Sequence, residues 1–207
     1  GASQAQGQSG EALKIIGGID ARALCGKAVL MGDELHNRNQ AATALCFTEI
    51  IHGYLQADLP KDTLREVLNF MSENIEMFWA TPHLGVCKAM LDPAHGIEGS
   101  TVCTKMSDNG VEFGIMVSGL KNQWFTAPAP MVKGLYFPGF SERDANPDLG
   151  GSRIKETAGF GGMCIATSPA ICLLVGGTPK ETVEHTLNMF EITVTENPAY
   201  QIPYLDF

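Results

Sequence analysis

The sequence predicts a helix-rich α+β domain with a small antiparallel sheet in its middle, at about residues 100–127. Before residue 92, apolar residues recur every three or four positions, which is the spacing of one helix face. Between residues 101 and 127 they alternate, as they do in a strand. The composition, with 44% hydrophobic and 18% charged residues, suits a buried core. We therefore expect a single domain over residues 19–207, preceded by a flexible leader or an expression remnant over residues 1–18.

The first half of the chain is expected to be helical. Helices are predicted over residues 21–31, over residues 40–55, from Pro60 onward and over residues 83–91. The helix after Pro60 has apolar residues at positions i, i+3, i+4 and i+7, counted from Leu64. Thr81 and Pro82 match an N-cap followed by proline at the first helical position, so we expect the fourth helix to begin there.

A β-hairpin is expected next. Residues 101–106 and 111–117 are two strands, the second with clear alternation of apolar residues, joined by a four-residue loop over residues 107–110. Residues 122–127 can add a third antiparallel strand. The stretch from residue 128 to residue 153 is rich in proline and glycine and has no periodicity, which is typical of a functional loop. Its aromatic residues favour an ordered, packed conformation.

The last part of the chain contains a clear helix start. Thr178, Pro179 and Glu181 match a capping box with proline at the first helical position. The preceding uncharged stretch, residues 157–179, contains too many glycines and prolines for a transmembrane span. We interpret it as a tightly packed core segment of small residues.

Charge and cysteine usage exclude several classes of partner. Fourteen Lys and Arg residues against twenty-three Asp and Glu give a net charge of −9, which repels nucleic acid and anionic membranes. The chain also has six widely spaced cysteines, without a Cys-x-x-Cys pair and mostly in apolar stretches. They predict buried thiols in a reducing compartment, and hence a cytoplasmic protein. We expect no cofactor and no metal, because the five histidines lack metal-ligand spacing.

The segment Met31–Asn39 concentrates polar groups between two apolar runs. It holds two carboxylates, an imidazole, a guanidinium and two amides. Polar groups near a core must either hydrogen-bond within the protein or serve a functional site. If the segment continues a helix, Glu34 and Arg38 form an i, i+4 pair. If Gly32 breaks the chain, Asn37 can cap the next helix with Gln40 as its N3 partner.

The broken-chain geometry would make an anion site, since backbone N–H groups, His36 and Arg38 would point at one spot. Asp33 and Glu34 would oppose an anion unless they were paired or acted as bases. The alternative is a purely structural polar turn between two helices, in which Glu34 and Arg38 form a salt bridge and His36 is hydrogen-bonded within the protein. The spacing leaves both interpretations open.

Other segments offer weaker candidates. His95, Ser100 and Thr101 surround two glycines before a strand. Such a turn can let the backbone approach a ligand, or its hydroxyl groups can hydrogen-bond locally. Trp124 and Thr126 end a strand, where pockets often form. Glu156 and Thr157 precede a glycine-rich stretch that permits close packing or ligand approach.

Several blocks of the chain, in order and spacing, resemble one family. They are Met31–Asn39, His95–Thr101, Trp124–Pro130, Gly134–Gly139, Asp144–Asp148, Glu156–Gly162, Gly176–Thr178 and Glu196–Phe207. The family is the YlbE-like, or AllG-like, family. One member is a subunit of oxamate carbamoyltransferase, which works with FdrA-like and AllH-like subunits in purine-ureide breakdown. The resemblance covers nearly everything from about Ile19, and because family members are longer, it implies that this chain is a portion of such a protein.

The resemblance implies carbamoyl transfer between oxalurate or oxamate and phosphate, with carbamoyl phosphate as the other small anion. Such chemistry needs donors for the anions and for the carbamoyl oxygen. We expect the catalytic residues to be His36, Arg38 and Glu34. The expected substrate-binding residues are Asp33, Asn37, Asn39, His95, Ser100, Thr101, Trp124, Thr126, Glu156 and Thr157. The alternatives are a non-catalytic assembly subunit of that complex, or a transferase acting on another small amide or ureide. A second copy of this chain, in a homo-oligomer, is a further expected partner.

Overall fold

The computed structural model describes residues 2–120, 122–132 and 134–206 and confirms the helix-rich α+β class. The helices are α1 (Ala2–Ile15), α2 (Ala21–Leu30), α3 (Gln40–Gln56), α4 (Lys61–Glu73), α5 (Ala80–Leu91), α6 (Ile154–Thr157), α7 (Pro169–Val175) and α8 (Pro179–Met189). The strands are β1 (Cys103–Asn109), β2 (Glu112–Val117), β3 (Trp124–Pro128) and β4 (Leu149–Gly150). Short 3-10 helices include η3 (Gly151–Arg153) and η4 (Gly161–Thr167).

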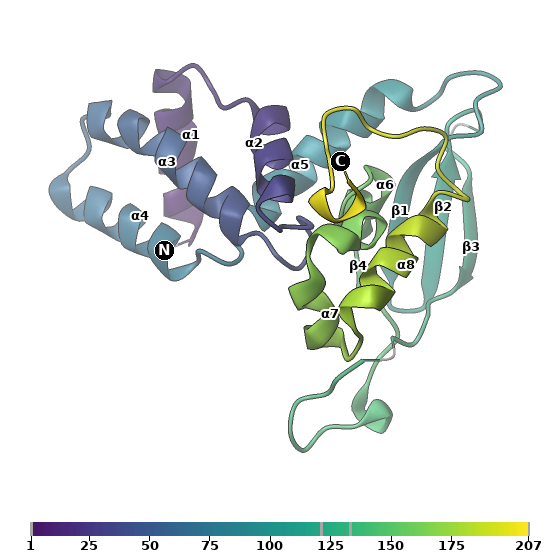
Figure 1. Cartoon of the computed structure of the whole chain (residues 1–207). Coiled ribbons are helices and arrows are strands. Elements are labelled where there is room, and N and C mark those ends of the chain that lie inside the picture. The colour runs from purple at the N-terminus through teal and green to yellow at the C-terminus, as the bar shows by residue number, and fades with distance from the viewer. Residues whose placement is uncertain (1, 121, 133, 207) are drawn as a thin grey trace.

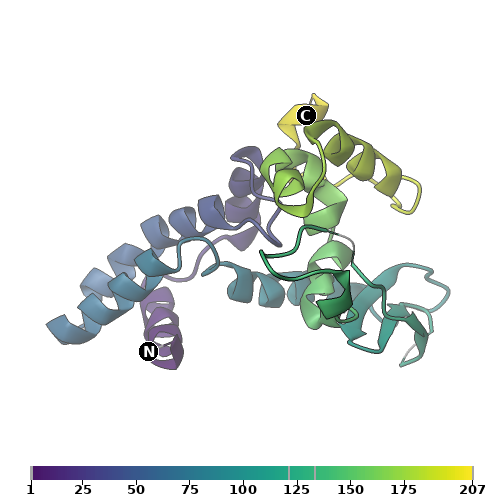
Figure 2. The same cartoon turned by 90° about the horizontal axis from the view of Figure 1, so that it is seen from below.

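The molecule is elongated, with helices at one end and the sheet at the other (Figure 1). Helices α1, α3 and α4 form the helical end, while α6, α7 and α8 lie beside the sheet. Helices α2 and α5 lie between the two ends. Viewed from below, α3 and α4 run side by side away from the rest of the molecule (Figure 2).

The sheet is antiparallel and has the strand order β3-β2-β1-β4. Its hairpin is tighter than expected, because Asp108 pairs with Phe113 and so belongs to strand β1. The Asn109 side chain accepts the backbone N–H groups of Val111 and Glu112, at 2.9 and 2.7 Å, and closes the turn. The long segment after β3 returns to the sheet as β4, which pairs with the end of β1.

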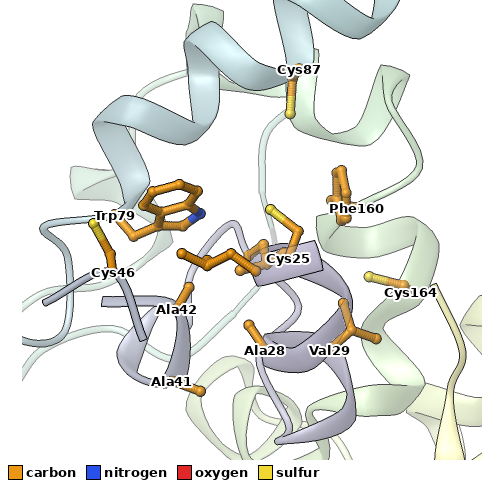
Figure 3. Packing of buried hydrophobic residues seen from close by; sticks show 12 residues of the cluster. Cys25, Ala28, Val29, Ala41, Ala42, Cys46, Trp79, Cys87, Phe160 and Cys164 are labelled. Carbon is orange, nitrogen blue, oxygen red and sulfur yellow. The ribbon is translucent and has the colours of Figure 1, made fainter. Parts of the chain in front are cut away.

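Buried apolar residues form two clusters. The larger lies between α2, α3 and α5 and includes Cys25, Trp79 and Phe160, which Figure 3 shows directed into one region. The smaller joins α1, α3 and α4 around Tyr54 and Met71. All six cysteines are free thiols and, except for the half-buried Cys103, they are buried, as the sequence predicted.

The expectation of a flexible leader over residues 1–18 is wrong for the described residues, because residues 2–15 form α1, which packs against α3 and α4. Ala12 is fully buried, and the Ser9 hydroxyl lies 2.5 Å from that of Tyr54. Gly53 makes this packing possible: a Cβ atom there would lie 2.3 Å from the Ala12 carbonyl oxygen. The polar composition of residues 1–10 hid this contact.

One further helix boundary differs from the prediction, and another agrees with it. Helix α5 begins at Ala80 rather than at Thr81–Pro82, because the residues before it already turn and the carbonyl of Trp79 accepts the N–H of His83. The capping box of α8 is confirmed, with the Thr178 and Glu181 side chains each bonded to the other residue's backbone N–H.

The uncharged stretch 157–179 is divided between η4 and α7. In the part of the chain that the structure describes, no helix combines the length and apolarity that crossing a bilayer requires.

The α1–α3 contact yields a stability prediction. Gly53→Ala is expected to destabilise the chain by about 1–3 kcal/mol, because its new methyl group meets the backbone of α1. The matched control is Gly85→Ala on α5, where a Cβ meets no atom within 4 Å. That substitution should be neutral or stabilise the helix by up to about 1 kcal/mol. Urea unfolding measures both; equal gains in stability would show that α1 does not pack on α3.

Candidate functional site

The segment Met31–Asn39 is a broken turn between α2 and α3, as in the second predicted geometry. Helix α2 ends at Leu30, and Gly32 and Leu35 have positive φ angles of 98° and 67°. Asp33, Glu34 and Asn39 are buried, each with at most 1% of its surface exposed. A turn that buries two carboxylates must supply them with donors.

Glu34 receives its donors from the turn itself. Its carboxylate accepts the backbone N–H groups of His36, Asn37 and Arg38 at 3.1, 2.5 and 2.6 Å. Burial raises the pKa of the Glu34 carboxyl above its ordinary value, and these N–H donors oppose the rise. The backbone donors expected to bind an external anion are therefore occupied by the chain's own carboxylate.

Asp33 caps the following helix. One carboxylate oxygen accepts the backbone N–H of Ala42 at 2.9 Å, and the other accepts Nε of Arg38 at 3.1 Å. Burial raises the pKa of the Asp33 carboxyl, against the effect of these two donors. The predicted cap by Asn37 and the predicted Glu34–Arg38 ion pair are both wrong, since Asp33 provides the cap and the ion-pair partner.

The remaining amide and the start of α3 complete the turn. Asn39 occupies the N-cap position but makes no capping bond with its side chain. Instead its amide nitrogen donates to the His36 carbonyl at 3.0 Å. Gln40, expected as the capping partner of Asn37, donates to Glu76 at 3.2 Å. The bond from Asn39 holds the carbonyl group of His36, whereas the bond from Gln40 is an exposed contact between side chains.

His36 pairs with Glu156 from the other half of the chain. Nδ1 of His36 lies 2.5 Å from Oε1 of Glu156, and the same oxygen accepts the N–H of Gly162 at 3.2 Å. Gly161 has a φ of 61°, and a Cβ atom there would lie 2.0 Å from Glu156 Oε1. Its N–H donates to the Glu34 carbonyl at 2.7 Å. The glycine-rich stretch thus permits close packing at the imidazole–carboxylate pair.

The remaining donors of this region are exposed enough to meet a ligand. Nε2 of His36 makes no hydrogen bond to a described residue, and the side chain is 22% exposed. Arg38 uses only Nε, its side chain is 33% exposed, and its two outer nitrogens are unpaired among the described residues. The same turn thus carries an imidazole suited to proton transfer and, two residues later, a guanidinium fork suited to a carboxylate or phosphate.

Two buried residues near this pair were not predicted from the sequence. His83 on α5 is fully buried; its Nδ1 lies 3.0 Å from the Leu35 carbonyl oxygen, and its ring packs edge-on against Phe160. Lys155 precedes Glu156 on α6 and is 2% exposed. Adjacency to Glu156 was the one available signal for Lys155, since lysine is ordinarily exposed.

The other predicted site residues lie elsewhere. Nδ1 of His95 lies 2.8 Å from the Thr104 hydroxyl, and Ser100 accepts the N–H of Val102 at 3.4 Å, while Thr101 is exposed. Trp124 and Thr126 lie on β3, at the exposed edge of the sheet. Among the described residues, no hydrogen bond or ion pair connects these five to the Met31–Asn39 turn. Thr157 is on α6 next to Glu156 and donates to the Arg153 carbonyl.

Fold and site together define an α+β protein with a candidate site for a small anion beside a histidine–glutamate pair. The family model of oxamate carbamoyltransferase subunit AllG matches residues 3–152, and the chain belongs to this family. The chain is 38% identical to oxamate carbamoyltransferase subunit AllG of Escherichia coli K12, over 92% of this chain and 45% of that protein. The predicted family resemblance is confirmed.

Two more relatives extend the comparison. The uncharacterized protein YahG of Escherichia coli K12 is 48% identical over 95% of this chain and 42% of its own length. A crystal structure of a conserved protein of unknown function from Enterococcus faecalis V583 superposes with a TM-score of 0.88 at 44% identity. It matches 92% of this chain and 45% of that chain. The chain thus spans less than half the length of the relatives it matches.

Burial of His83 predicts a specific acid sensitivity. Burial, reinforced by the charge of Lys155, lowers the pKa of His83 to about 4. Between that value and the unfolded value of about 6.5, the unfolded chain binds a proton that the folded chain excludes. Stability is therefore lost as the pH falls through this window, by on the order of 3 kcal/mol.

His83→Gln tests this prediction, because glutamine can still donate to the Leu35 carbonyl but does not titrate. Urea unfolding of both proteins at neutral pH and near pH 4 is expected to show a smaller acid-induced loss in the variant. Asp33, Glu34 and the other histidines are common to both proteins, so their contributions to the difference largely cancel. Parallel stability curves would contradict the assignment.

Proposed function

We propose that this chain forms part of a carbamoyltransferase of the oxamate/oxalurate type, which passes a carbamoyl group between oxalurate and phosphate. The main observation in support is the His36–Glu156 pair, in which Nδ1 and Oε1 lie 2.5 Å apart, in the same region as the partly free guanidinium of Arg38. Family membership supports the reaction class, because one relative is named as an oxamate carbamoyltransferase subunit.

His36 is the proposed proton-transfer residue. Glu156 accepts from Nδ1, which fixes the ring orientation and favours the tautomer whose Nε2 can face a ligand. The carboxylate also stabilises the imidazolium that forms when Nε2 takes a proton. Glu156 thus positions His36, and the Glu34-bound turn holds the histidine backbone in place.

The balanced reaction shows what this histidine does. A phosphate oxygen bonds to the carbamoyl carbon of oxalurate, and the bond from that carbon to the internal nitrogen breaks, which releases oxamate and carbamoyl phosphate. The proton of hydrogen phosphate passes through His36 to the departing nitrogen. Arg38 binds the carboxylate or the phosphate through its outer nitrogens, and that fixed charge orients the two anions for attack.

Further features of the proposal concern the assembly and its location. The whole protein acts with FdrA-like and AllH-like subunits in the cytoplasm, where the buried free thiols stay reduced. Partner surfaces are available, because every residue of β3 is exposed and Phe137, in the loop after it, is 82% exposed. Apolar side chains on an unpaired sheet edge favour contact with protein.

Replacing the histidine tests the proton-transfer role. In the full-length protein with its partner subunits, His36→Gln is expected to lower kcat by about 10²- to 10⁴-fold. Glu156→Gln should lower kcat less and change the pH profile, since an imidazolium without its carboxylate is less stable. The control is His52→Gln on the exposed face of α3, which should leave turnover unchanged. Equal turnover of His36→Gln and His52→Gln would refute the role.

The second candidate function is a non-catalytic assembly subunit, which the exposed apolar edge of β3 favours. Arg38→Ala separates the two functions. As a substrate-binding residue, Arg38 should raise KM or abolish turnover on replacement, while the complex elutes intact from a sizing column. As an assembly residue, it should give dissociated subunits. Intact complexes with normal kinetics would exclude Arg38 from both functions.

A further inference from the structure

Strand β3 is an open edge of the sheet. Among the described strands it pairs only with β2, and no other described element lies beyond it (Figure 1). Every residue of β3 is exposed, including the apolar Trp124 and Phe125 at 46% and 40%. Edge strands are usually protected by charged side chains, by bulges or by a covering segment. Strand β3 contains no charged residue, so its outer main chain is open to another strand.

The register shows which main-chain groups of β3 point outward. In an antiparallel pair, residues alternate between those that bond to the neighbouring strand and those that face the other way. The N–H of Ala129, just after β3, donates to the carbonyl of Val111, just before β2, at 2.8 Å. Counting back from Ala129 in steps of two gives the residues of β3 that bond to β2. The residues whose main-chain groups point outward are therefore Trp124, Thr126 and Pro128.

Both faces of the strand offer apolar surface near this edge. Trp124 and Thr126 lie over Gly114 of β2, where a Cβ atom would be 3.0 Å from the Trp124 ring and 3.5 Å from the Thr126 methyl carbon. Phe125 lies on the opposite face, because side chains alternate along a strand. The Thr126 hydroxyl donates to Glu112 at 3.1 Å. A strand added at this edge would thus gain main-chain hydrogen bonds and apolar contacts together.

We propose that β3 is an interface between two copies of this chain, whose β3 strands pair antiparallel about a two-fold axis at Thr126. In this register the whole length of the strand is paired. Each Thr126 N–H donates to the Thr126 carbonyl of the other copy, and each Trp124 N–H donates to the Pro128 carbonyl of the other copy. Pro128 has no N–H to return, so the Trp124 carbonyl keeps its water.

The partner is a second copy because the strand is complementary to itself. The two-fold axis places Trp124 against Pro128, Phe125 against Ala127 and the two threonines against each other, which are favourable cross-strand pairs. Each chain has a net charge of −9, but within the paired strands no like charges meet. The inference concerns assembly and does not rest on the proposed function.

Sedimentation velocity of this chain tests the interface. A single strand pairing belongs to the small, weak class of interfaces, so the concentration series extends to about 1 mM. Over this range the monomer is expected to give way to a species of twice its mass.

Hydrogen exchange of the original chain at low and high concentration checks which groups pair. The amides of Trp124 and Thr126 should become protected as the dimer forms. The amides of Phe125 and Ala127 bond to β2 and should be protected at both concentrations.

Thr126→Lys is the test variant, because it places two like charges opposite each other at the two-fold axis. It is expected to weaken the association at least about tenfold. Thr48→Lys, at an exposed position of α3, is the matched control, since it adds the same charge away from the sheet and should dimerise as the original chain does.

Three results would overturn the proposal. A monomer at every concentration would leave the edge of β3 to a different protein. A dimer whose Trp124 and Thr126 amides exchange as fast as in the monomer would show that the copies meet elsewhere. Equal dimerisation of Thr126→Lys and Thr48→Lys would show that Thr126 does not lie at the axis.

Discussion

The carboxylate of Glu34, held by three successive backbone N–H groups, is the interaction on which the rest of the site depends. It closes the turn between α2 and α3 from within, so that the carbonyls of Glu34 and Leu35 point away to other elements. The Glu34 carbonyl accepts Gly161, and the Leu35 carbonyl lies at hydrogen-bonding distance from His83. One buried acid therefore connects the helical end of the molecule to α5 and to the glycine-rich segment.

The sheet contributes by anchoring α6, the short helix that carries Lys155 and Glu156. Arg153 pairs with Asp108 of β1 and with Asp148 in the preceding loop, and its guanidinium lies 5.4 Å from the Phe113 ring centroid. This anchor places Glu156 against His36 without a direct contribution from the sheet to the site. On a chain of net charge −9, His36 and the partly free Arg38 are the donors that the proposed anion site offers.

Local sequence signals predicted most of the secondary structure. The capping box of α8, the periodicity of α4 and the alternation in β2 each involve residues within a few positions of one another, and the structure confirms all three. The errors have a tertiary cause. Helix α1 is polar by composition, yet it packs because Gly53 on α3 lets the two backbones approach. The turn of the hairpin is shorter than predicted because Asn109 closes it.

The sequence by itself determined the family, the class of fold and the concentration of polar groups in Met31–Asn39. Only the tertiary structure decided which donor meets which acceptor. Glu34 accepts backbone N–H groups and not the Arg38 guanidinium. Asp33 caps α3 in place of Asn37. Glu156 bonds to His36 across 120 positions of the chain. The physical reason is burial. A carboxylate or an amine removed from water must bind whatever partner the fold brings within reach, and spacing along the chain does not specify that partner.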